Sequence, residues 1–262
     1  MRTYPPMMVH TSGEGEDLLL FHGGMGSWRH WVRNIEELSQ HFRVHALDLP
    51  GYGDSAAVRR KIPAQEYFDL VHEQIDANFG GTSPLRAAGF SFGSVVASAV
   101  LPRFGARLRG FSLIGPSGFG PPKQAVKLAT RSYREANGDP GMFDEIARQN
   151  LLAVMLLHPA SVDEQALRLQ RENIELHKGM NSSEVSILDI VPEALGKMRC
   201  PVQLIYGEKD QVARKDLEER IARCQRSCPD IDLTIIPNTG HWAMYEAPEA
   251  VNSALVRFHG AA

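Results

Sequence analysis

The 262-residue sequence predicts an α/β fold in which helices flank a mostly parallel central sheet. Short apolar runs that end in Gly, Pro or Asp clusters alternate with segments of helical periodicity. Strands that alternate with helices indicate a parallel sheet covered on both faces. The alternation stops between residues 117 and 197, which carry helical patterns and no convincing strand. We therefore expect a core domain formed by residues 1–116 and 198–262, and a helical cap inserted at residues 117–197.

The individual elements follow from length and periodicity. Six apolar runs have the length of strands and are bounded by turn residues. These runs are residues 18–21, 44–47, 85–90, 110–114, 202–206 and 231–236. In other segments the apolar residues recur at helical spacing, which buries one stripe of a helix against a sheet. These segments are residues 28–41, 64–79 and 93–101 in the core, and 142–157 and 162–176 in the insertion.

Composition excludes several classes of protein. The net charge is −3 and the acidic and basic residues are interspersed, so nothing indicates a nucleic-acid partner. No secretory signal and no apolar stretch of membrane-spanning length is visible, and we expect a cytoplasmic protein without a membrane partner. Cys200, Cys224 and Cys228 are too few for a disulfide framework and lack further zinc ligands, so we expect packed thiols. The sequence leaves the oligomeric state open.

A G-x-S-x-G motif occupies residues 89–93, with Ser91 at its centre. It lies between the predicted strand at 85–90 and the helix of small residues at 93–101. A serine on such a strand-to-helix turn has a strained backbone and a hydroxyl lifted clear of the sheet. The alternative is a Gly-Ser turn in which the serine only caps the helix. The position between strand and helix favours Ser91 as a nucleophile.

A glycine-rich loop, HGGMG at residues 22–26, follows the first predicted strand. Acyl transfer needs two backbone N–H donors around the developing oxyanion. We expect one from the residue after the nucleophile, Phe92, and one from Gly24, with Met25 as the second choice. A flexible turn and a phosphate-binding loop are alternatives, although the G-K-[ST] ending of a phosphate loop is missing. We expect His22 to brace the loop through its ring nitrogens.

His241 is the strongest candidate for the general base that a serine nucleophile requires. It lies in the segment NTGHW at residues 238–242, after the last predicted strand. The carboxyl end of a parallel strand is where such sheets place ligands and chemistry. A solvated imidazole is the expectation for the histidines near segment ends or in polar stretches, which are His10, His41, His158, His177 and His259.

The carboxylate that orients the base should follow another strand. Asp210 and Glu208 both follow the predicted strand at 202–206, whereas the strand end at 114–117 offers no acid. Such a carboxylate would hold the imidazole in the required tautomer and stabilise the imidazolium. We favour Asp210, with Glu208 as the alternative. A loop salt bridge or a turn hydrogen bond is the other possible role of either side chain.

With these residues in place, the chain resembles the α/β-hydrolase superfamily along nearly its whole length. The order Ser91, Asp210, His241 is that of α/β hydrolases and differs from two other common serine-protease orders. Residues 48–55, DLPGYGDS, match the D-x-x-G-x-G-x-S loop typical of these proteins. The resemblance implies that Asp48 is structural and that the insertion covers the active site and shapes an acyl pocket. It implies no metal ion and no organic cofactor, and the serine separates the chain from haloalkane dehalogenases and epoxide hydrolases, which use an aspartate.

A closer similarity is to the meta-cleavage product hydrolases, which split carbon–carbon bonds in vinylogous 1,5-diketone acids. Residues 240–242 and 113–120 are similar to the corresponding segments of those enzymes. They commonly have Asn before the nucleophile, where this chain has Phe90, and a cap arginine that holds the substrate carboxylate. Arg168 and Arg171 lie in about the right region, where an exposed helix arginine is the other interpretation.

The leading hypothesis is a carboxylesterase-like serine hydrolase that acts on a small or medium ester through an acyl-enzyme at Ser91. A C–C bond hydrolase is the first alternative. A ligand-binding receptor with little turnover is another, as is a thioesterase or editing hydrolase that acts on a carrier-bound acyl chain. We expect a small-molecule substrate in a largely apolar pocket, and the candidate lining residues are Met25, Phe90, Phe92, Phe119 and Trp242.

Overall fold

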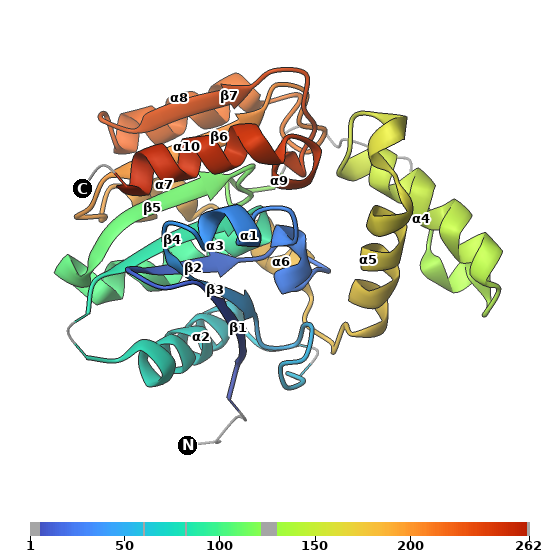
Figure 1. Ribbon diagram of the computed structural model, residues 1–262, viewed down its shortest axis with the longest axis horizontal. Coiled ribbons are helices and arrows are strands. Elements are labelled where there is room, and N and C mark those ends of the chain that lie inside the picture. Colours follow the sequence, from blue (N-terminus) through green and yellow to red (C-terminus); the bar gives the residue numbers. More distant parts are fainter. Residues whose placement is uncertain (1–5, 60, 82, 122–129, 261–262) are drawn as a thin grey trace.

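The computed structural model describes residues 6–59, 61–81, 83–121 and 130–260, and its centre is a seven-stranded sheet (Figure 1). The strand order is β1-β3-β2-β4-β5-β6-β7. Only β1 runs antiparallel to its neighbour, so the prediction of a mostly parallel sheet is confirmed. The strands are β1 (Met8–Ser12), β2 (Asp17–Phe21), β3 (Arg43–Asp48), β4 (Leu85–Phe90), β5 (Leu108–Ile114), β6 (Val202–Gly207) and β7 (Asp232–Ile236).

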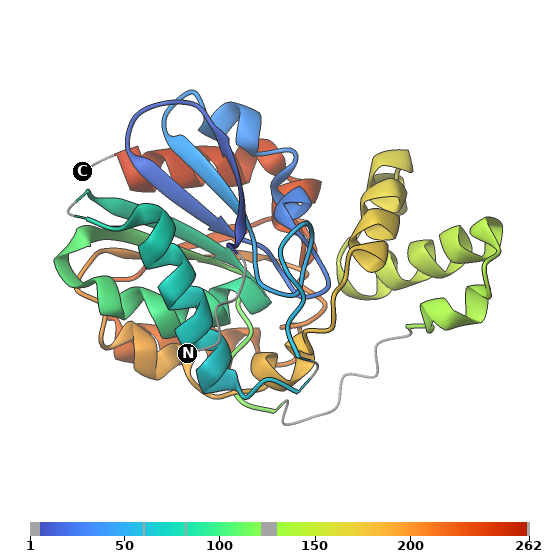
Figure 2. The ribbon, with the colours of Figure 1, turned by 90° about the horizontal axis from the view of Figure 1, so that it is seen from below.

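The sheet has two apolar faces because side chains alternate along each strand. In β2, Leu19 and Phe21 belong to one buried cluster, and Leu18 and Leu20 belong to the other. The first cluster lies under α2 (Ala64–Phe79), α3 (Phe92–Val100), α7 (Val191–Leu195) and α8 (Leu217–Ser227). The second lies under η1 (Trp28–Trp31), α1 (Ile35–Leu38), α9 (Ala243–Glu246) and α10 (Pro248–Gly260). Figure 2 shows α2 and α10 on opposite sides of the sheet.

Two local predictions differ from the structure. The edge strand β1 was not predicted, because its side chains are exposed or only partly buried and form no apolar run. The single helix expected at residues 28–41 is divided into η1 and α1. Between them, the Asn34 side chain donates to the Met244 carbonyl and to Asn252 Oδ1. These tertiary hydrogen bonds hold the chain in a turn that periodicity does not reveal.

One of the remaining elements precedes β5, and the others lie between β5 and β6. They are η2 (Leu101–Arg107) before β5, and then η3 (Tyr133–Ala136), α4 (Pro140–Val154), η4 (Pro159–Ser161), α5 (Glu164–Glu175) and α6 (Ser182–Ser186) before α7. Helices α4 and α5 pack on each other and stand beside the carboxyl ends of the parallel strands (Figures 1 and 2). Helices α6 and α7 instead pack against α3.

The boundaries of the predicted insertion, 117 and 197, stay a prediction, and its residues 122–129 lie outside the described part of the chain. Among its described residues there is no strand, and an isolated bridge joins Phe119 and Asp189. The three cysteines are free. None of the helices in the described segments combines the length and apolar character needed to cross a bilayer.

Candidate active site

Ser91 occupies the sharp turn between β4 and α3. Its backbone has φ 50° and ψ −114°, a strained conformation for a residue with a side chain. A Cβ at Gly93 would lie 2.4 Å from the His22 carbonyl oxygen, and one at Gly89 would lie 2.8 Å from the Ser94 Cα. Both glycines are therefore needed for this turn. The Ser91 side chain makes no capping hydrogen bond to α3, which contradicts the alternative that it only caps the helix.

Three side chains from distant segments meet at this turn. The Ser91 Oγ lies 3.0 Å from His241 Nε2, and His241 Nδ1 lies 2.8 Å from Asp210 Oδ2. Because a carboxylate only accepts hydrogen bonds, the imidazole proton lies on Nδ1, which donates to Asp210. The other ring nitrogen, Nε2, accepts a hydrogen bond from the serine hydroxyl. His241 and Asp210 are buried, so water competes little for these bonds. The arrangement can remove a proton from a serine nucleophile.

The carboxylate of Asp210 is fixed by its own loop. Its Oδ1 accepts the backbone N–H groups of Val212 at 2.8 Å and Ala213 at 3.1 Å, which leaves Oδ2 for His241. Glu208 instead accepts the backbone N–H of Asn238, and this hydrogen bond holds the pKa of its carboxyl below the usual value. Of the two candidate carboxylates, the structure brings only Asp210 to the imidazole.

Two residues of the site were missed in the sequence, because only an acid was sought at the end of β5. A Cβ at Gly115, where φ is +48°, would lie 3.1 Å from both Asp210 Oδ2 and His241 Nδ1. Ser117 Oγ lies 3.5 Å from the Ser91 Oγ. A third missed residue is Gln211, whose Oε1 accepts the backbone N–H of His241 at 3.1 Å. The one sequence signal for Gly115 and Ser117 is their position directly after a strand, where parallel sheets place functional residues.

The predicted oxyanion donors lie side by side. The Phe92 N–H is the first of α3, and a Cβ at Gly24 would lie 3.6 Å from the Phe92 Cβ. Among the described residues, neither the Phe92 N–H nor the Gly24 N–H has a hydrogen-bond partner. Met25, the second choice, has φ 53° and is 44% exposed. This geometry suits two amide donors for a developing negative charge beside Ser91.

His22 braces the glycine-rich loop, as expected. Its Nδ1 lies 2.7 Å from the Gly23 carbonyl oxygen and its Nε2 accepts the Leu49 N–H at 3.0 Å. Full burial lowers the pKa of this imidazole, so the ring is neutral and donates only through Nδ1. The ring therefore ties the loop after β2 to the loop after β3.

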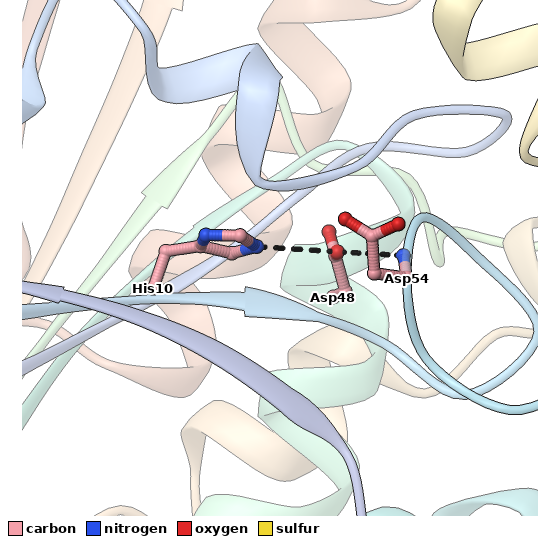
Figure 3. Close-up of side chains that lie close together, drawn as sticks. All are labelled: His10, Asp48 and Asp54. Atoms are coloured by element: carbon pink, nitrogen blue, oxygen red, sulfur yellow. Dashed lines mark hydrogen bonds and ion pairs between the residues drawn. The ribbon is translucent and has the colours of Figure 1, made fainter.

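Asp48 belongs to a group of three side chains whose ligand atoms lie within 4.8 Å of one another, together with His10 and Asp54 (Figure 3). The Asp48 oxygens already accept the backbone N–H of Trp28 at 2.8 Å and that of Asp54 at 2.9 Å. His10 Nε2 lies 3.5 Å from the Asp48 Oδ2. These contacts fit the structural role that the resemblance implies for Asp48, which is to join β1 and the two loops.

A cavity of about 650 Å³ lies between the glycine-rich loop and the helices η3, α4 and α5. Gly24, Met25 and His30 line it on the core side. The opposite wall includes Arg131, Tyr133, Arg134, Leu151, Val154, Met155 and Ile174. Ser91 is not a lining residue, but Gly24 connects the cavity to the oxyanion donors.

The structure brings only one of the five predicted lining side chains, that of Met25, to this cavity. Phe90, Phe92 and Trp242 are buried in the core, where the Phe90 ring lies 5.0 Å from that of His241 and supports the base. Phe119 lies elsewhere, with the guanidinium of Arg220 5.3 Å from its ring centroid. Phe90 ends β4, Phe92 begins α3 and Trp242 directly precedes α9, and at these positions the large apolar side chains pack into the core.

The arginines at the cavity are not those that were predicted. Arg171 pairs with Asp144 at 2.5 Å, and Arg168 is 65% exposed on α5. Arg131 and Arg134, from η3 and the residues before it, line the cavity. Arg131 pairs with two glutamates, whereas the Arg134 guanidinium has no partner among the described residues. No motif marks η3, so sequence reasoning had no signal for this pair.

The expectation of a solvated ring is wrong for His259. Its side chain is fully buried, and burial lowers its pKa to about 3. The His259 Nε2 lies 2.9 Å from Ser112 Oγ, which in turn donates to Gln203 Oε1 at 2.9 Å. His177 is partly buried and lines the cavity.

Known hydrolases are similar to this chain over most of its length. Residues 18–254 match the model of the "Alpha/beta hydrolase family". A pimeloyl-[acyl-carrier protein] methyl ester esterase of Chromobacterium violaceum is 27% identical over 90% of this chain and 91% of its own length. A 2-hydroxy-6-oxo-6-phenylhexa-2,4-dienoate hydrolase of Burkholderia cepacia is 26% identical over 95% and 90%. A thermophilic esterase from Thermogutta terrifontis, 22% identical, covers 97% of this chain and 93% of its own with a TM-score of 0.68.

Proposed function

Because this chain belongs to the alpha/beta hydrolase family, we propose that it is a serine hydrolase that cleaves small or medium carboxylic esters through an acyl-enzyme at Ser91. The observation that carries the proposal is the hydrogen-bonded series from the Ser91 Oγ through His241 to Asp210. The N–H groups of Phe92 and Gly24, which have no partner in the described residues, support it. The esterase among its relatives is in line with an ester substrate.

Acylation uses the triad and both backbone N–H donors. Ser91 Oγ attacks the ester carbonyl carbon while its proton passes to His241 Nε2, and the Asp210 carboxylate stabilises the imidazolium. The Gly24 and Phe92 N–H groups donate to the oxyanion of the tetrahedral intermediate. The intermediate then collapses, the C–O bond to the alcohol breaks, and His241 returns the proton to the departing oxygen.

Deacylation repeats the sequence with water. His241 Nε2 takes a proton from the water molecule as its oxygen attacks the acyl carbon of the Ser91 ester. The second tetrahedral intermediate collapses, the bond from the acyl carbon to Ser91 Oγ breaks, and His241 returns the proton to Ser91 Oγ as the carboxylic acid leaves. Both half-reactions use the same donors and the same base, so no further group is required for the proton transfers.

The cavity supports a substrate of small or medium size. A volume of about 650 Å³ suits a small molecule, and Leu151, Val154 and Ile174 give its wall an apolar surface. We therefore propose that an acyl group of small or medium size lies under α4 and α5, which would act as a cap that keeps water from the intermediates.

One observation favours C–C bond hydrolysis as a second candidate. The guanidinium of Arg134 lines the cavity and has no partner among the described residues, so it is available for a substrate carboxylate. The relative from Burkholderia cepacia is a dienoate hydrolase by name. Comparing kcat/KM for p-nitrophenyl esters with that for a dienoate diketone acid separates the two candidates, because only a C–C hydrolase would prefer the acid.

A fluorophosphonate probe tests the proposed function directly. We expect stoichiometric labelling of the wild type and none of Ser91→Ala, since the probe reacts only with an activated serine. Ser117→Ala is the matched control, because its hydroxyl lies near the site without contacting His241, and it should still be labelled. A wild type that is folded by circular dichroism but remains unlabelled would contradict the proposal and support a receptor with little turnover.

A further inference from the structure

His30 has a position in the site that the proposed mechanism does not use. It belongs to η1 and is buried between the glycine-rich loop and the core. Its Nδ1 accepts the Gly23 N–H at 3.1 Å. The ring covers Gly26, where a Cβ would lie 2.1 Å from the His30 Cε1, and its centroid lies 5.0 Å from that of Trp242. These contacts fix the ring in one orientation.

The surroundings also fix the protonation state of this ring. Burial holds the pKa of His30 well below its usual value, and the nearby His22 and His241 lower it further. The imidazole is therefore neutral at pH 7. A neutral imidazole has one donor and one acceptor nitrogen, and Nδ1 is the acceptor because it receives the Gly23 N–H. The proton must lie on Nε2.

The hydrogen bonds of His30 among the described residues involve its Nδ1 and its backbone, and none of them uses the Nε2–H group. Trp242 donates to the His30 backbone carbonyl and leaves the ring nitrogens alone. His30 lines the cavity together with Gly24, the proposed oxyanion donor. Because His30 lines the cavity, water can pair with this donor when the cavity is empty, and a ligand that displaces the water must supply an acceptor in its place.

We propose that the Nε2–H of His30 is a specificity-determining donor that binds an oxygen acceptor in the acyl part of the substrate. The preferred substrates would then be esters whose acyl chain carries a keto, hydroxyl or ether oxygen near the reacting carbonyl. An all-carbon chain at that place leaves the donor unpaired, which is the situation in which sites discriminate most strongly. This inference rests on the proposed ester hydrolysis and adds a substrate class to it.

Matched pairs of esters test the proposal. p-Nitrophenyl methoxyacetate differs from p-nitrophenyl butanoate only in that an ether oxygen replaces one methylene group. The p-nitrophenyl esters of 3-methoxypropanoate and pentanoate form a second pair, in which the oxygen lies one carbon farther from the ester carbonyl. The quantity of interest is the ratio of kcat/KM within a pair. We expect this ratio to fall about tenfold or more in His30→Leu for at least one oxygen position, in line with the loss of one hydrogen bond.

The ratio separates donation from positioning. If His30 only supported the loop through Gly23, His30→Leu would slow both members of a pair equally and the ratio would not change. His30→Gln keeps a donor and an acceptor on one side chain, and it should restore the ratio to within about threefold of the wild type. His177→Leu, at another wall of the cavity, is the control and should leave the ratio unchanged. Unchanged ratios at every oxygen position in His30→Leu would overturn the proposal.

A measurement without turnover keeps this inference distinct from the proposed function. Long-range ¹H–¹⁵N NMR of the histidine rings should show His30 as the neutral Nε2–H tautomer between pH 6 and 8. An Nδ1–H or doubly protonated ring would refute the inference even in an active esterase. Conversely, if His30 shows the expected tautomer but fluorophosphonates do not label the protein, the proposed ester hydrolysis is contradicted and the assignment of the His30 donor is not.

Discussion

Backbone conformations that side chains rarely adopt define the site at the scale of single residues. Ser91 has φ 50°, and Gly115, directly opposite, has φ +48°. The first lifts a hydroxyl toward the base, and the second leaves room for the His241–Asp210 pair. Strain of this kind persists only where the surrounding structure holds it in place, and here β4, α3 and β5 do so.

Gly115→Ala should reduce kcat by about 10- to 100-fold, because its Cβ would displace the imidazole and the carboxylate. Gly105→Ala is the matched control, since Gly105 has φ +56° and nothing within 4 Å of the Cβ position. Both variants should lose about 1–2 kcal/mol of unfolding free energy through strain. Steady-state kinetics and urea unfolding check this, and an equal loss of kcat in both variants would show that space at Gly115 is not what matters.

Asp210→Asn should lower kcat by roughly 10³- to 10⁴-fold, because an amide can favour the wrong imidazole tautomer while it preserves the shape of the side chain. Glu208→Gln should keep kcat within about twofold, since Glu208 contacts Asn238 and not His241. Kinetics on a p-nitrophenyl ester tests the pair. The reverse ranking of the two variants would mean that Glu208 orients the base.

Hydrogen bonds between loops connect the elements of the core to the helices above the site. Glu246, at the end of α9, accepts the backbone N–H groups of Leu157, His158 and Gly240. Gln211 accepts the His241 N–H and donates to the Leu156 carbonyl at 2.9 Å. The loops that carry Asp210 and His241 are thus joined to the segment between α4 and α5, so the position of these helices and the geometry of the base are coupled.

Glu246→Gln should weaken this connection, because one amide oxygen replaces two and the amide nitrogen would face the Gly240 N–H. We expect a loss of about 1–3 kcal/mol in unfolding free energy and about a tenfold fall in kcat/KM. Glu249→Gln, at an exposed position in the first turn of α10, should change neither. Wild-type kinetics in Glu246→Gln would indicate that the loops hold His241 without help from Glu246.

Buried neutral imidazoles link the stability of the whole molecule to pH. His22, His30 and His259 are almost completely buried, and burial lowers the pKa of each. The folded protein therefore excludes protons that the unfolded chain binds below its ordinary histidine pKa of about 6.5. The contribution of these groups to stability is complete above that pH and is lost as the pH falls toward the folded pKa.

For His259, with a folded pKa of about 3, the loss extends from about pH 6.5 down to pH 3. It adds at most about 1.4 kcal/mol per pH unit to the decline of the unfolding free energy. His259→Gln should make this decline shallower between pH 6 and 4, although it costs stability at pH 7.5 by disturbing Ser112. His41→Gln, at an exposed imidazole, is the control and should retain the wild-type slope. Urea unfolding at several pH values measures this decline. If the unfolding free energy falls equally steeply with pH in His259→Gln and in the wild type, His259 is not a source of the pH dependence.

Much of the fold could be predicted because it depends on local signals. Apolar runs of strand length bounded by turn residues place β2 to β7 in order along the chain, and helical spacing places α2. The edge strand β1 and the break at Asn34 escaped prediction, because partners distant in sequence determine both. His259 was misjudged for the same reason, as its position near the chain end concealed its burial against Ser112.

The chemical identities at the site were available in the sequence, because a nucleophile, a base and an acid are recognised by residue type and by position after a strand. The sequence favoured Asp210 over Glu208, and the structure brings Asp210 to the imidazole. Tertiary structure alone sent Phe119 and Trp242 away from the cavity and brought Arg134 and His30 to its walls. The physical reason is the sequence separation between the residues that interact. Strand and turn signals act between neighbours in sequence, whereas the lining of a cavity depends on where helices 100 or more residues apart come to rest on one another.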